Sequence, residues 1–355
     1  MMVRASAIVF GFVLASTGCS EGEPTQPPAP PSELERDLRE LVDGAVASGF
    51  EGSLLITVGG ERVMTEGHGL ANRERGLENT PDTAFDVGSI MKSFTATALF
   101  RLGEDGSVEL SDTLGEIFPE APADKAEITL RDVLQHSAGF DEYHDTEGDF
   151  EPMTRLEARE RIFAQELLFE PGTDAAYSNS GYTLLADVIE TVSGEPFVDY
   201  VRSALFEPAG LEQTGFYSEP LWQSVETAAG YDASTFGDND PASWPYTWAL
   251  VGNGGLVTTV LDLDRWLTAL WDGRVVSETT LELMRTEYLA GGAAELDGTT
   301  VYSEAGAGDF GLGGVLVFAP EPDTRVLIAT NSYDTYDIEA LGLELTLRAM
   351  DAPAP

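Results

Sequence analysis

Cysteine and histidine are scarce in this sequence. Cys19 is the only cysteine among 355 residues, so no disulfide can form within the chain. The three histidines, His68, His136 and His144, do not stand in the pair spacings of metal ligands and offer no catalytic triad. No H-E-x-x-H, dinucleotide-binding or phosphate-binding glycine motif occurs in the context that it needs. We therefore expect neither a metal nor a nucleotide cofactor.

Basic residues are also few. Lysine and arginine together number 19 against 62 aspartates and glutamates, which gives a formal net charge of −43. Such a surface repels nucleic acid and anionic lipid headgroups, and no basic patch offsets it. The simplest interpretation is a solvated acidic coat. With so little lysine, the coat also raises the hypothesis of a saline habitat.

The N-terminal apolar run, Ala5 to Ala15, is too short to span a membrane as a mature helix. It follows the basic start at residues 1–4 and ends before Cys19, so residues 1–19 resemble a bacterial lipoprotein signal with lipidation of that cysteine. Ser16 stands where such signals usually carry leucine. The alternative is an ordinary cleaved signal with an incidental cysteine. Either interpretation predicts export, and with the lipid anchor we expect the protein in the bacterial cell envelope, on the periplasmic face.

Residues 20–31 are rich in proline and predict an extended tether. At about 3.1 Å per residue, this segment could reach roughly 35–40 Å. One folded domain is expected over residues 32–350, with a mostly helical lobe at roughly 105–250. Within that lobe, residues 218–250 lack periodicity and are rich in Pro, Trp, Tyr and Asp, which predicts a long loop over a cleft.

Strand patterns occur near both ends of the domain. Residues 53–58 and 61–65 predict a hairpin, and residues 315–318 and 325–329 predict two further strands. Helical periodicity accounts for residues 34–45, 129–134, 155–168, 181–192, 196–206, 261–272, 278–287 and 335–350. This order predicts an α/β (α+β) fold, in which helices flank an antiparallel sheet formed by both chain ends and a mostly helical lobe is inserted.

The most informative stretch is Phe-Asp-Val-Gly-Ser-Ile-Met-Lys at 85–92, which contains an S-x-x-K motif. Helical spacing follows it, so a helix is expected to begin at or beside Ser89. Residues three apart share a helix face, which lets Lys92 meet the Ser89 hydroxyl. A desolvated lysine loses its proton more readily and can serve as the base that a serine nucleophile needs. A capping serine before an ordinary helix lysine is the alternative, which this motif alone does not exclude.

A second cluster is Pro-Gly-Thr-Asp-Ala-Ala-Tyr-Ser-Asn at 171–179. Tyr177 beside a lysine could shuttle protons, because cationic neighbours lower the pKa of a phenol. Asn179 could hydrogen-bond a substrate amide. A buried core tyrosine and a turn asparagine are the alternative interpretation.

Taken together, these two stretches resemble the serine β-lactamase/penicillin-binding-protein family. The most similar branch is that of the class C β-lactamases, D-alanyl carboxypeptidases and esterases. Further similar segments follow in the family's order at residues 134–140, 206–211 and 254–264. The resemblance covers roughly residues 33–350. It implies that Ser89 forms an acyl-enzyme, that Lys92 and Tyr177 move the proton, and that His136 is structural.

The family's third motif, usually Lys-Thr-Gly or His-x-Gly, is where the chain departs. The best match is Glu304-Ala305-Gly306, so a glutamate replaces the usual basic residue. A carboxylate there would repel an anionic substrate, while the small residues after it let the strand lie close to substrate. By the resemblance, the N–H groups of Ser89 and Ala307 form the oxyanion hole.

The resulting expectation is a monomeric serine hydrolase that acts on a small ester, amide or lactam, most simply with esterase-type or broad acyl hydrolysis. β-Lactamase or D-alanyl-D-alanine carboxypeptidase activity is the alternative within the same chemistry. A non-catalytic envelope-binding lipoprotein on the same fold is the alternative of a different kind. The altered third motif is its support, and the retained serine, lysine and tyrosine argue against it.

Overall fold

A computed structural model describes residues 32–231, 239–296 and 298–351. The predicted signal at 1–19, the lipidated Cys19 and the tether at 20–31 lie outside the described residues. Among the residues that are described, no helix is both long and apolar enough to cross a membrane.

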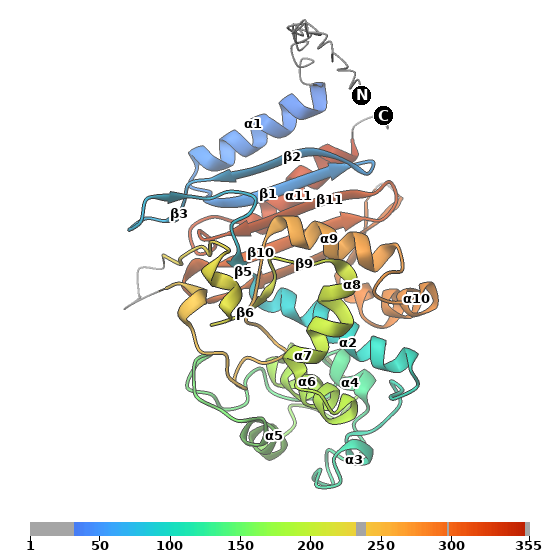
Figure 1. Cartoon of the computed structure of the whole chain (residues 1–355). Coiled ribbons are helices and arrows are strands. Elements are labelled where there is room, and N and C mark those ends of the chain that lie inside the picture. The colour runs from blue at the N-terminus through green and yellow to red at the C-terminus, as the bar shows by residue number, and fades with distance from the viewer. Residues whose placement is uncertain (1–31, 232–238, 297, 352–355) are drawn as a thin grey trace, which may run out of the picture.

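A six-stranded antiparallel sheet forms the upper layer of the molecule in Figure 1. Its spatial order is β2-β1-β11-β10-β9-β8, so strands from both chain ends lie side by side at its centre. Leu54 of β1 pairs with Ile328 of β11, which confirms the predicted sheet. The strands are β1 (Gly52–Val58), β2 (Glu61–His68), β8 (Ala293–Leu296), β9 (Thr299–Ala307), β10 (Gly313–Ala319) and β11 (Thr324–Thr330).

Two terminal helices cover one face of the sheet, α1 (Glu33–Ala47) and α11 (Ile338–Met350). Ser32 begins α1 with a capping box, in which its hydroxyl accepts from the N–H of Glu35. The apolar faces of α1 and α11 meet the outer side chains of β1, β10 and β11 in one buried cluster. Apolar residues that recur about every 3.6 positions in the helices and every second position in the strands produce these faces, and the same spacing was the basis of the prediction from sequence.

The opposite face of the sheet rests on α2 (Met91–Glu104) and α9 (Val260–Trp271), with the helical lobe beyond them (Figure 1). Every residue of α2 from Met91 to Phe100 is buried, because the helix runs between the sheet and the lobe. The lobe contains α3 (Leu114–Ile117), α4 (Leu130–Leu134), α5 (Arg155–Ala164), α6 (Asn179–Ser193), α7 (Phe197–Val201) and α8 (Glu207–Ala209), and α10 (Glu278–Glu287) lies beside α2.

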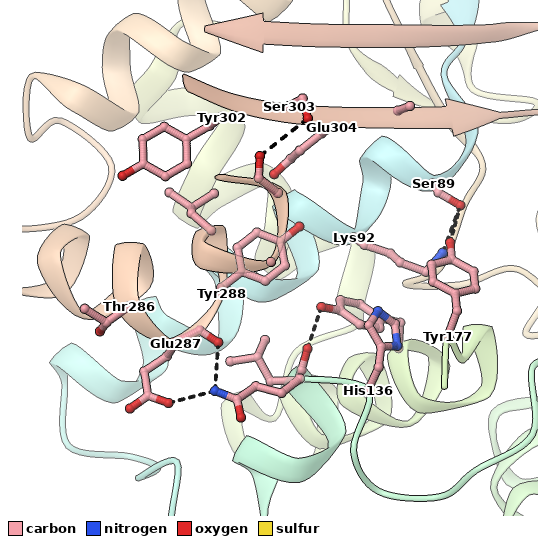
Figure 2. A pocket seen from close by; sticks show the side chains of 17 residues that line it. Ser89, Lys92, His136, Tyr177, Thr286, Glu287, Tyr288, Tyr302, Ser303 and Glu304 are labelled. Atoms are coloured by element: carbon pink, nitrogen blue, oxygen red, sulfur yellow. Dashed lines mark hydrogen bonds between the residues drawn. The ribbon is translucent and has the colours of Figure 1, made fainter. Parts of the chain in front are cut away.

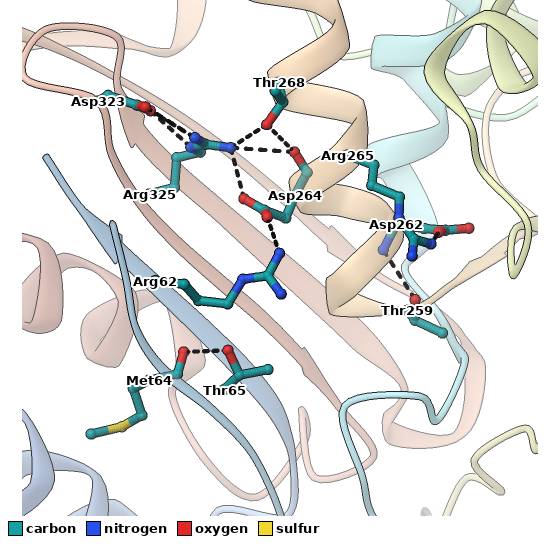
Figure 3. Close-up of polar contacts among 10 residues, drawn as sticks. All are labelled: Arg62, Met64, Thr65, Thr259, Asp262, Asp264, Arg265, Thr268, Asp323 and Arg325. Carbon is teal, nitrogen blue, oxygen red and sulfur yellow. Dashed lines mark hydrogen bonds and ion pairs between the residues drawn. The ribbon is translucent and has the colours of Figure 1, made fainter. Parts of the chain in front are cut away.

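Ion pairs hold α9 to the sheet (Figure 3). Asp264 accepts from Arg62 of β2 at 2.6 Å and from Arg325 of β11 at 2.7 Å, and both Asp264 and Arg325 are largely buried. Asp262 accepts from the hydroxyl of Thr214 at 2.8 Å. These contacts fix the start of α9, and with it the segment that leads into the helix from the site.

That segment belongs to a small antiparallel sheet in the order β5-β7-β6, formed by β5 (Phe85–Asp86), β7 (Leu256–Thr258) and β6 (Gly215–Phe216). Because β5 immediately precedes Ser89, its pairing with β7 brings residues 253–255 beside the serine turn. The remaining two-stranded sheet pairs β3 (Leu70–Asn72) with β4 (Leu77–Glu78).

Two predicted helices differ from the structure. The helix expected over 155–168 ends at Ala164, because Gln165 turns to extended backbone and its amide donates to the carbonyl of Tyr143. The helix expected over 196–206 winds as a π-helix from Arg202 to Phe206 after α7. Both differences depend on contacts with other parts of the chain, which the spacing of apolar residues does not indicate.

The loop predicted over 218–250 contains two short 3₁₀ turns, Pro220–Gln223 and Pro241–Ser243, and residues 232–238 within it lie outside the described residues. In its described parts, Trp222 and Trp244 are buried. Leu250 lines a cavity beside Ser89.

Candidate active site

Ser89 lies in a 3₁₀ turn, Gly88–Ile90, that runs directly into α2. Strand β9 touches this turn. A Cβ on Gly88, whose φ is +51°, would lie 2.1 Å from the carbonyl oxygen of Ala307. A Cβ on Gly306 would lie 2.1 Å from the carbonyl oxygen of Val87 and 2.6 Å from the Ser89 nitrogen. Only glycine fits at either position, so the serine turn and residues 306–307 of β9 are in direct contact.

Lys92 is buried and points at the serine. Its Nζ donates to Ser89 Oγ at 3.0 Å and to the carbonyl oxygen of Asn253 at 2.7 Å. Burial lowers the pKa of Lys92 to about 7, although the nearby carboxylates of Asp149 and Glu142 oppose the shift. A substantial fraction of the amine is therefore unprotonated at neutral pH and able to accept the serine proton.

The hydroxyl of Tyr177 lies 2.6 Å from Ser89 Oγ, and Lys92 Nζ lies 4.9 Å from the centroid of the Tyr177 ring. Burial raises the pKa of Tyr177, and the hydrogen bond to Ser89 only partly offsets it. The pKa of Tyr177 is thus raised rather than lowered, which differs from the expectation of a pKa lowered by a cationic neighbour; the nearby Glu142 also raises it. Tyr177 is thus a neutral hydroxyl in the resting site, able to donate and accept.

His136 supports the tyrosine. Its ring lies 4.9 Å from that of Tyr177 and 5.0 Å from that of Tyr182, measured between centroids, and its Nδ1 accepts from the N–H of Ser178 at 3.1 Å. Burial and the nearby Lys92 lower the pKa of His136 to about 4, so the ring is neutral. These contacts agree with the structural role that the resemblance implied for this histidine.

Asn179 begins α6, where Ser178 caps the helix by accepting from the N–H of Gly181. The backbone N–H of Asn179 donates to the carbonyl of Glu142 at 2.9 Å. Asn179 lines a cavity of about 220 Å³ together with Ser89, Tyr177 and Ala307, so it stands within reach of a substrate bound at the serine.

Glu304 faces a second and larger cavity, of about 460 Å³, which also contains Ser89 and Lys92 (Figure 2). The residue is partly exposed, whereas its carboxyl end is enclosed next to Ser93 and Tyr288. Enclosure raises the pKa of Glu304 to about 7, and hydrogen bonds from Ser93 and Tyr288 work against that shift. Its negative charge is therefore only partial at neutral pH, which weakens the expected repulsion of anions without abolishing it.

The two cavities share Ser89 and Tyr177, so the nucleophile stands where they meet. Ala307 belongs to the smaller cavity and pairs with Gly313 of the next strand. A substrate carbonyl at the serine would therefore have a cavity on each side for its two substituents. Histidine, cysteine, aspartate and glutamate form no group of three suited to a metal within the described ranges.

Three site residues were missed by the sequence analysis. Asn253 holds Lys92 through its carbonyl, and it directly precedes the Gly254-Gly255 pair that the resemblance had singled out. Asp86 is buried and accepts from the N–H of Gly88 at 2.9 Å and from a tyrosine hydroxyl at 2.7 Å, which fixes the turn before the serine. Asp149 lines the smaller cavity from a loop that carries no recognisable motif.

Comparison with known sequences places this geometry in a family context. The Beta-lactamase family model matches residues 35–340. A Bacillus subtilis (strain 168) protein provisionally named penicillin-binding protein PbpX is 32% identical over 238 residues, which cover 67% of this chain and 59% of that protein. Teichoic acid D-alanine hydrolase of Staphylococcus aureus is 26% identical over 235 residues, covering 64% and 56%. The chain thus spans less than two thirds of these relatives.

Solved structures share the fold. The octameric penicillin-binding protein homologue from Pyrococcus abyssi aligns with a TM-score of 0.74 and 26% identity, over 87% of this chain and 75% of that one. D-amino acid amidase from Ochrobactrum anthropi SV3, in complex with L-phenylalanine amide, aligns with a TM-score of 0.75 and 24% identity. That alignment covers 90% of this chain and 99% of the amidase, and it supports the architecture alone.

Proposed function

The chain belongs to the Beta-lactamase family of serine hydrolases, and from this premise we propose that it hydrolyses small esters or amides through an acyl-enzyme on Ser89. The observation that carries the proposal is the continuous contact from Lys92 to Ser89 to Tyr177, at 3.0 and 2.6 Å. A nucleophile, a base of suitable pKa and a second proton carrier are in contact without any rearrangement.

The proposed mechanism follows from these contacts. Lys92 accepts the Ser89 proton as Oγ attacks the carbonyl carbon, and the N–H groups of Ser89 and Ala307 stabilise the oxyanion. Tyr177 passes a proton to the leaving group, which departs as the acyl-enzyme forms. Water then attacks the acyl-enzyme, with the same groups accepting its proton, and the freed acid leaves Ser89 regenerated.

The substrate is proposed to lack a carboxylate near the scissile bond. Glu304 stands in the larger cavity at the place where the family usually has a basic residue, and the charge of the chain, −43, disfavours anions in general. The name of one similar protein, teichoic acid D-alanine hydrolase, also supports acyl hydrolysis. The intact serine, lysine and tyrosine argue against a non-catalytic binder.

The decisive experiment is steady-state hydrolysis of 4-nitrophenyl acetate by the full chain and by Ser89→Ala. We expect the variant to lose at least about 10³-fold in kcat/KM, because the nucleophile is gone. Its circular dichroism and thermal midpoint should match the unsubstituted protein, since Ser89 fills no core position. Equal turnover by both proteins would disprove the acyl-enzyme.

β-Lactamase or D-alanyl-D-alanine carboxypeptidase activity is the second candidate, favoured by the 32% identity with a protein named for penicillin binding. If Glu304 is what disfavours anionic substrates, Glu304→Lys should raise kcat/KM for a chromogenic cephalosporin about tenfold or more relative to the same value for the neutral ester. Glu344→Lys, at an exposed site on α11, makes the same formal change in net charge and is the control for it. No gain from Glu304→Lys would contradict this electrostatic account.

The site of action is proposed to be the cell envelope, with the protein held by a lipid on Cys19 and acting as a monomer that binds neither metal nor nucleic acid. This placement is supported by the signal-like segment at 1–19. It is also supported by two relatives whose names refer to penicillin binding and to teichoic acid. Radiolabelled palmitate incorporated by the full chain but not by Cys19→Ala would test the anchor.

A further inference from the structure

The carbonyl group of Asn253, which accepts from Lys92, belongs to a turn that a second residue of α2 also holds. The Thr95 hydroxyl donates to the carbonyl oxygen of Gly252 at 2.7 Å, beside the bond of 2.7 Å from Lys92 Nζ to Asn253. Ser89, Lys92 and Thr95 are spaced three apart, so their side chains follow one face of the helical segment. This face therefore carries the nucleophile, the proposed base and a hydroxyl that fixes the turn.

Helix α6 holds the same turn through Thr183. Its hydroxyl donates to the carbonyl oxygen of Val251 at 3.0 Å and accepts from Nδ2 of Asn253 at 2.8 Å. Asn253 Nδ2 also donates to the carbonyl oxygen of Ala249 at 3.2 Å. Thr183 and Asn253 are both buried, so these bonds are shielded from water. One hydroxyl thus fixes the backbone of the turn and also the side chain of the residue whose carbonyl group meets the lysine.

The turn is also packed closely against α6. A Cβ on Gly252 would lie 2.5 Å from the Cβ of Ala186, which is a residue of that helix. Helices α2 and α6 contact each other as well. Because Tyr177 stands shortly before the start of α6, the turn links the helix that carries Lys92 with the segment that carries the second proton carrier.

Lys92 depends on this turn for its direction. A lysine side chain is a flexible stem with many rotamers, so its hydrogen bonds decide where the amine lies. Its two acceptors are Ser89 Oγ at 3.0 Å and the carbonyl oxygen of Asn253 at 2.7 Å. Burial lowers the pKa of Lys92 to about 7, whereas a carbonyl acceptor favours the protonated amine. The distance to the Asn253 carbonyl group therefore affects both the position and the basicity of the amine.

Other titratable groups also face Lys92, and they do not belong to the turn. They are Asp149, Glu142, Glu304, His136, Tyr177 and Tyr182. The Thr183 hydroxyl bonds to none of them, since its partners are Val251 and Asn253. A substitution at Thr183 therefore changes how the turn is held and leaves the chemical identity of these groups unaltered.

We propose that Thr183 is a positioning residue for the base, which holds the turn at 251–253 so that the Lys92 amine is directed at Ser89. The inference rests on the proposed function, since it concerns the base of the same serine. Thr183 lines neither of the two cavities, so it acts through Asn253 and not on the substrate. If the turn moved away, the amine would lose a carbonyl acceptor, would be less well directed, and would release its proton at lower pH.

The first test is a titration that needs no substrate. Lys92 and Lys125 are the two lysines of the chain, so isotopic labelling of lysine at Cε gives two NMR signals whose chemical shifts follow the ionisation of the amines. Lys92→Met removes one signal and so assigns both. Thr183→Val has nearly the shape of threonine and removes the hydroxyl. We expect the titration midpoint of Lys92 to fall by at least about 0.5 pH units in this variant, and that of Lys125 to stay unchanged.

The second test is the hydrolysis of 4-nitrophenyl acetate by the full chain. We expect Thr183→Val to lower kcat/KM about tenfold, mainly through kcat, and to move the rise with pH in the same direction as the titration. Thr183→Ser keeps the hydroxyl and should restore both values. Asn253→Ala removes the other partner of the bond of 2.8 Å and should act in the same direction, so it replaces Thr183→Val if that variant does not fold.

The matched control is Thr346→Val on α11, on the far side of the sheet (Figure 1). Thr346 is buried and its hydroxyl donates to the carbonyl oxygen of Gly342 at 2.8 Å, so both valine variants lose a buried hydrogen bond and should have lower thermal midpoints. Only Thr183→Val should shift the Lys92 titration. A lower thermal midpoint in Thr183→Val with an unshifted titration and unchanged kcat would overturn the inference. Absence of ester hydrolysis by the unsubstituted protein would contradict the proposed function instead, and the titration would still decide whether Thr183 positions the amine.

Discussion

Lys92 is the residue whose surroundings decide the chemistry, because it is a buried amine with two oxygen acceptors and no salt-bridge partner among the described residues. Since burial lowers its pKa to about 7, the fraction that can act as a base increases as pH rises through 7. We therefore expect kcat/KM for a neutral ester to rise about tenfold per pH unit below 7 and to level off above it. A pH profile between 5 and 9 measures this directly.

The carboxyl groups of Glu304 and Asp86, near the serine, also have a pKa of about 7. The pH profile alone therefore does not show which of the three groups causes the rise in activity. Glu304→Gln removes one of the two carboxyl groups and Asp86→Asn the other. The rise with pH should persist in both variants if Lys92 is the base. A rise that vanished in Glu304→Gln would transfer the role to that carboxyl group.

Residue contacts were predictable from sequence only where the spacing is local. The S-x-x-K motif indicated the contact between Ser89 and Lys92, because three residues on a helical turn bring two side chains to one face. The raised pKa of Tyr177 was not predictable, since it depends on what surrounds its hydroxyl beside Ser89, which is distant in sequence. Asp149 lacked any signal for the same reason, as the next residue, Phe150, stacks on Phe310, which is distant in sequence.

Strand β9 acts on the site as an element, because its backbone, rather than its side chains, lies against the serine turn. Gly306→Ala would place a methyl group 2.1 Å from the carbonyl oxygen of Val87, so the strand and the turn must separate. We expect kcat to fall about 10²-fold, because a shift of about 1 Å in catalytic geometry has effects of that size. The same assay of ester hydrolysis provides the measurement.

Gly44→Ala is a matched control on α1, where the glycine is exposed and a Cβ would meet nothing within 4 Å. This variant should keep full activity and gain about 0.5–1 kcal/mol in the free energy of unfolding, as alanine favours a helix over glycine. Unchanged kcat in Gly306→Ala would show that the strand does not set the position of the serine.

Element positions were largely predictable because capping and turn residues mark their ends. Helix α10 was predicted at its observed bounds, 278–287, and Thr129 caps α4 as expected for a helix starting there. The π-helix after α7 escaped prediction, because it results from packing against α2 rather than from local preference. Strand β8 also escaped, since its exposed residues show no alternation of apolar side chains.

The charge of the whole molecule, −43, is spread over a fold whose 19 basic residues cannot pair with most of the 62 acidic ones. Self-repulsion among the unpaired carboxylates destabilises the compact state, and salt screens it, with a Debye length of about 3 Å at 1 M. We expect the thermal midpoint to rise by several degrees, about 5 °C, between 0.1 and 1 M KCl. Calorimetric scans at constant pH would show it.

Chloride is the appropriate anion for that comparison, because sulfate strengthens apolar burial in any protein. A midpoint that stayed constant or fell as KCl was added would contradict both the repulsion argument and the hypothesis of a saline habitat. Whole-molecule charge is a property that the sequence alone supplies in full.

The central pairing of β1 with β11 determines when the sheet can form during synthesis of the chain. Leu54 pairs with Ile328, which is synthesised 274 residues later. At about 5–20 residues per second, a ribosome needs roughly 14–55 s to reach Ile328, so this pair cannot form before then. During that interval β1 has only its hairpin partner, and a lone hairpin is marginally stable. Strand β9 joins the sheet through β10, so the serine turn gains its second wall only when synthesis is nearly complete. A polypeptide interrupted before Ile328 should carry Ser89 and Lys92 without catalytic power.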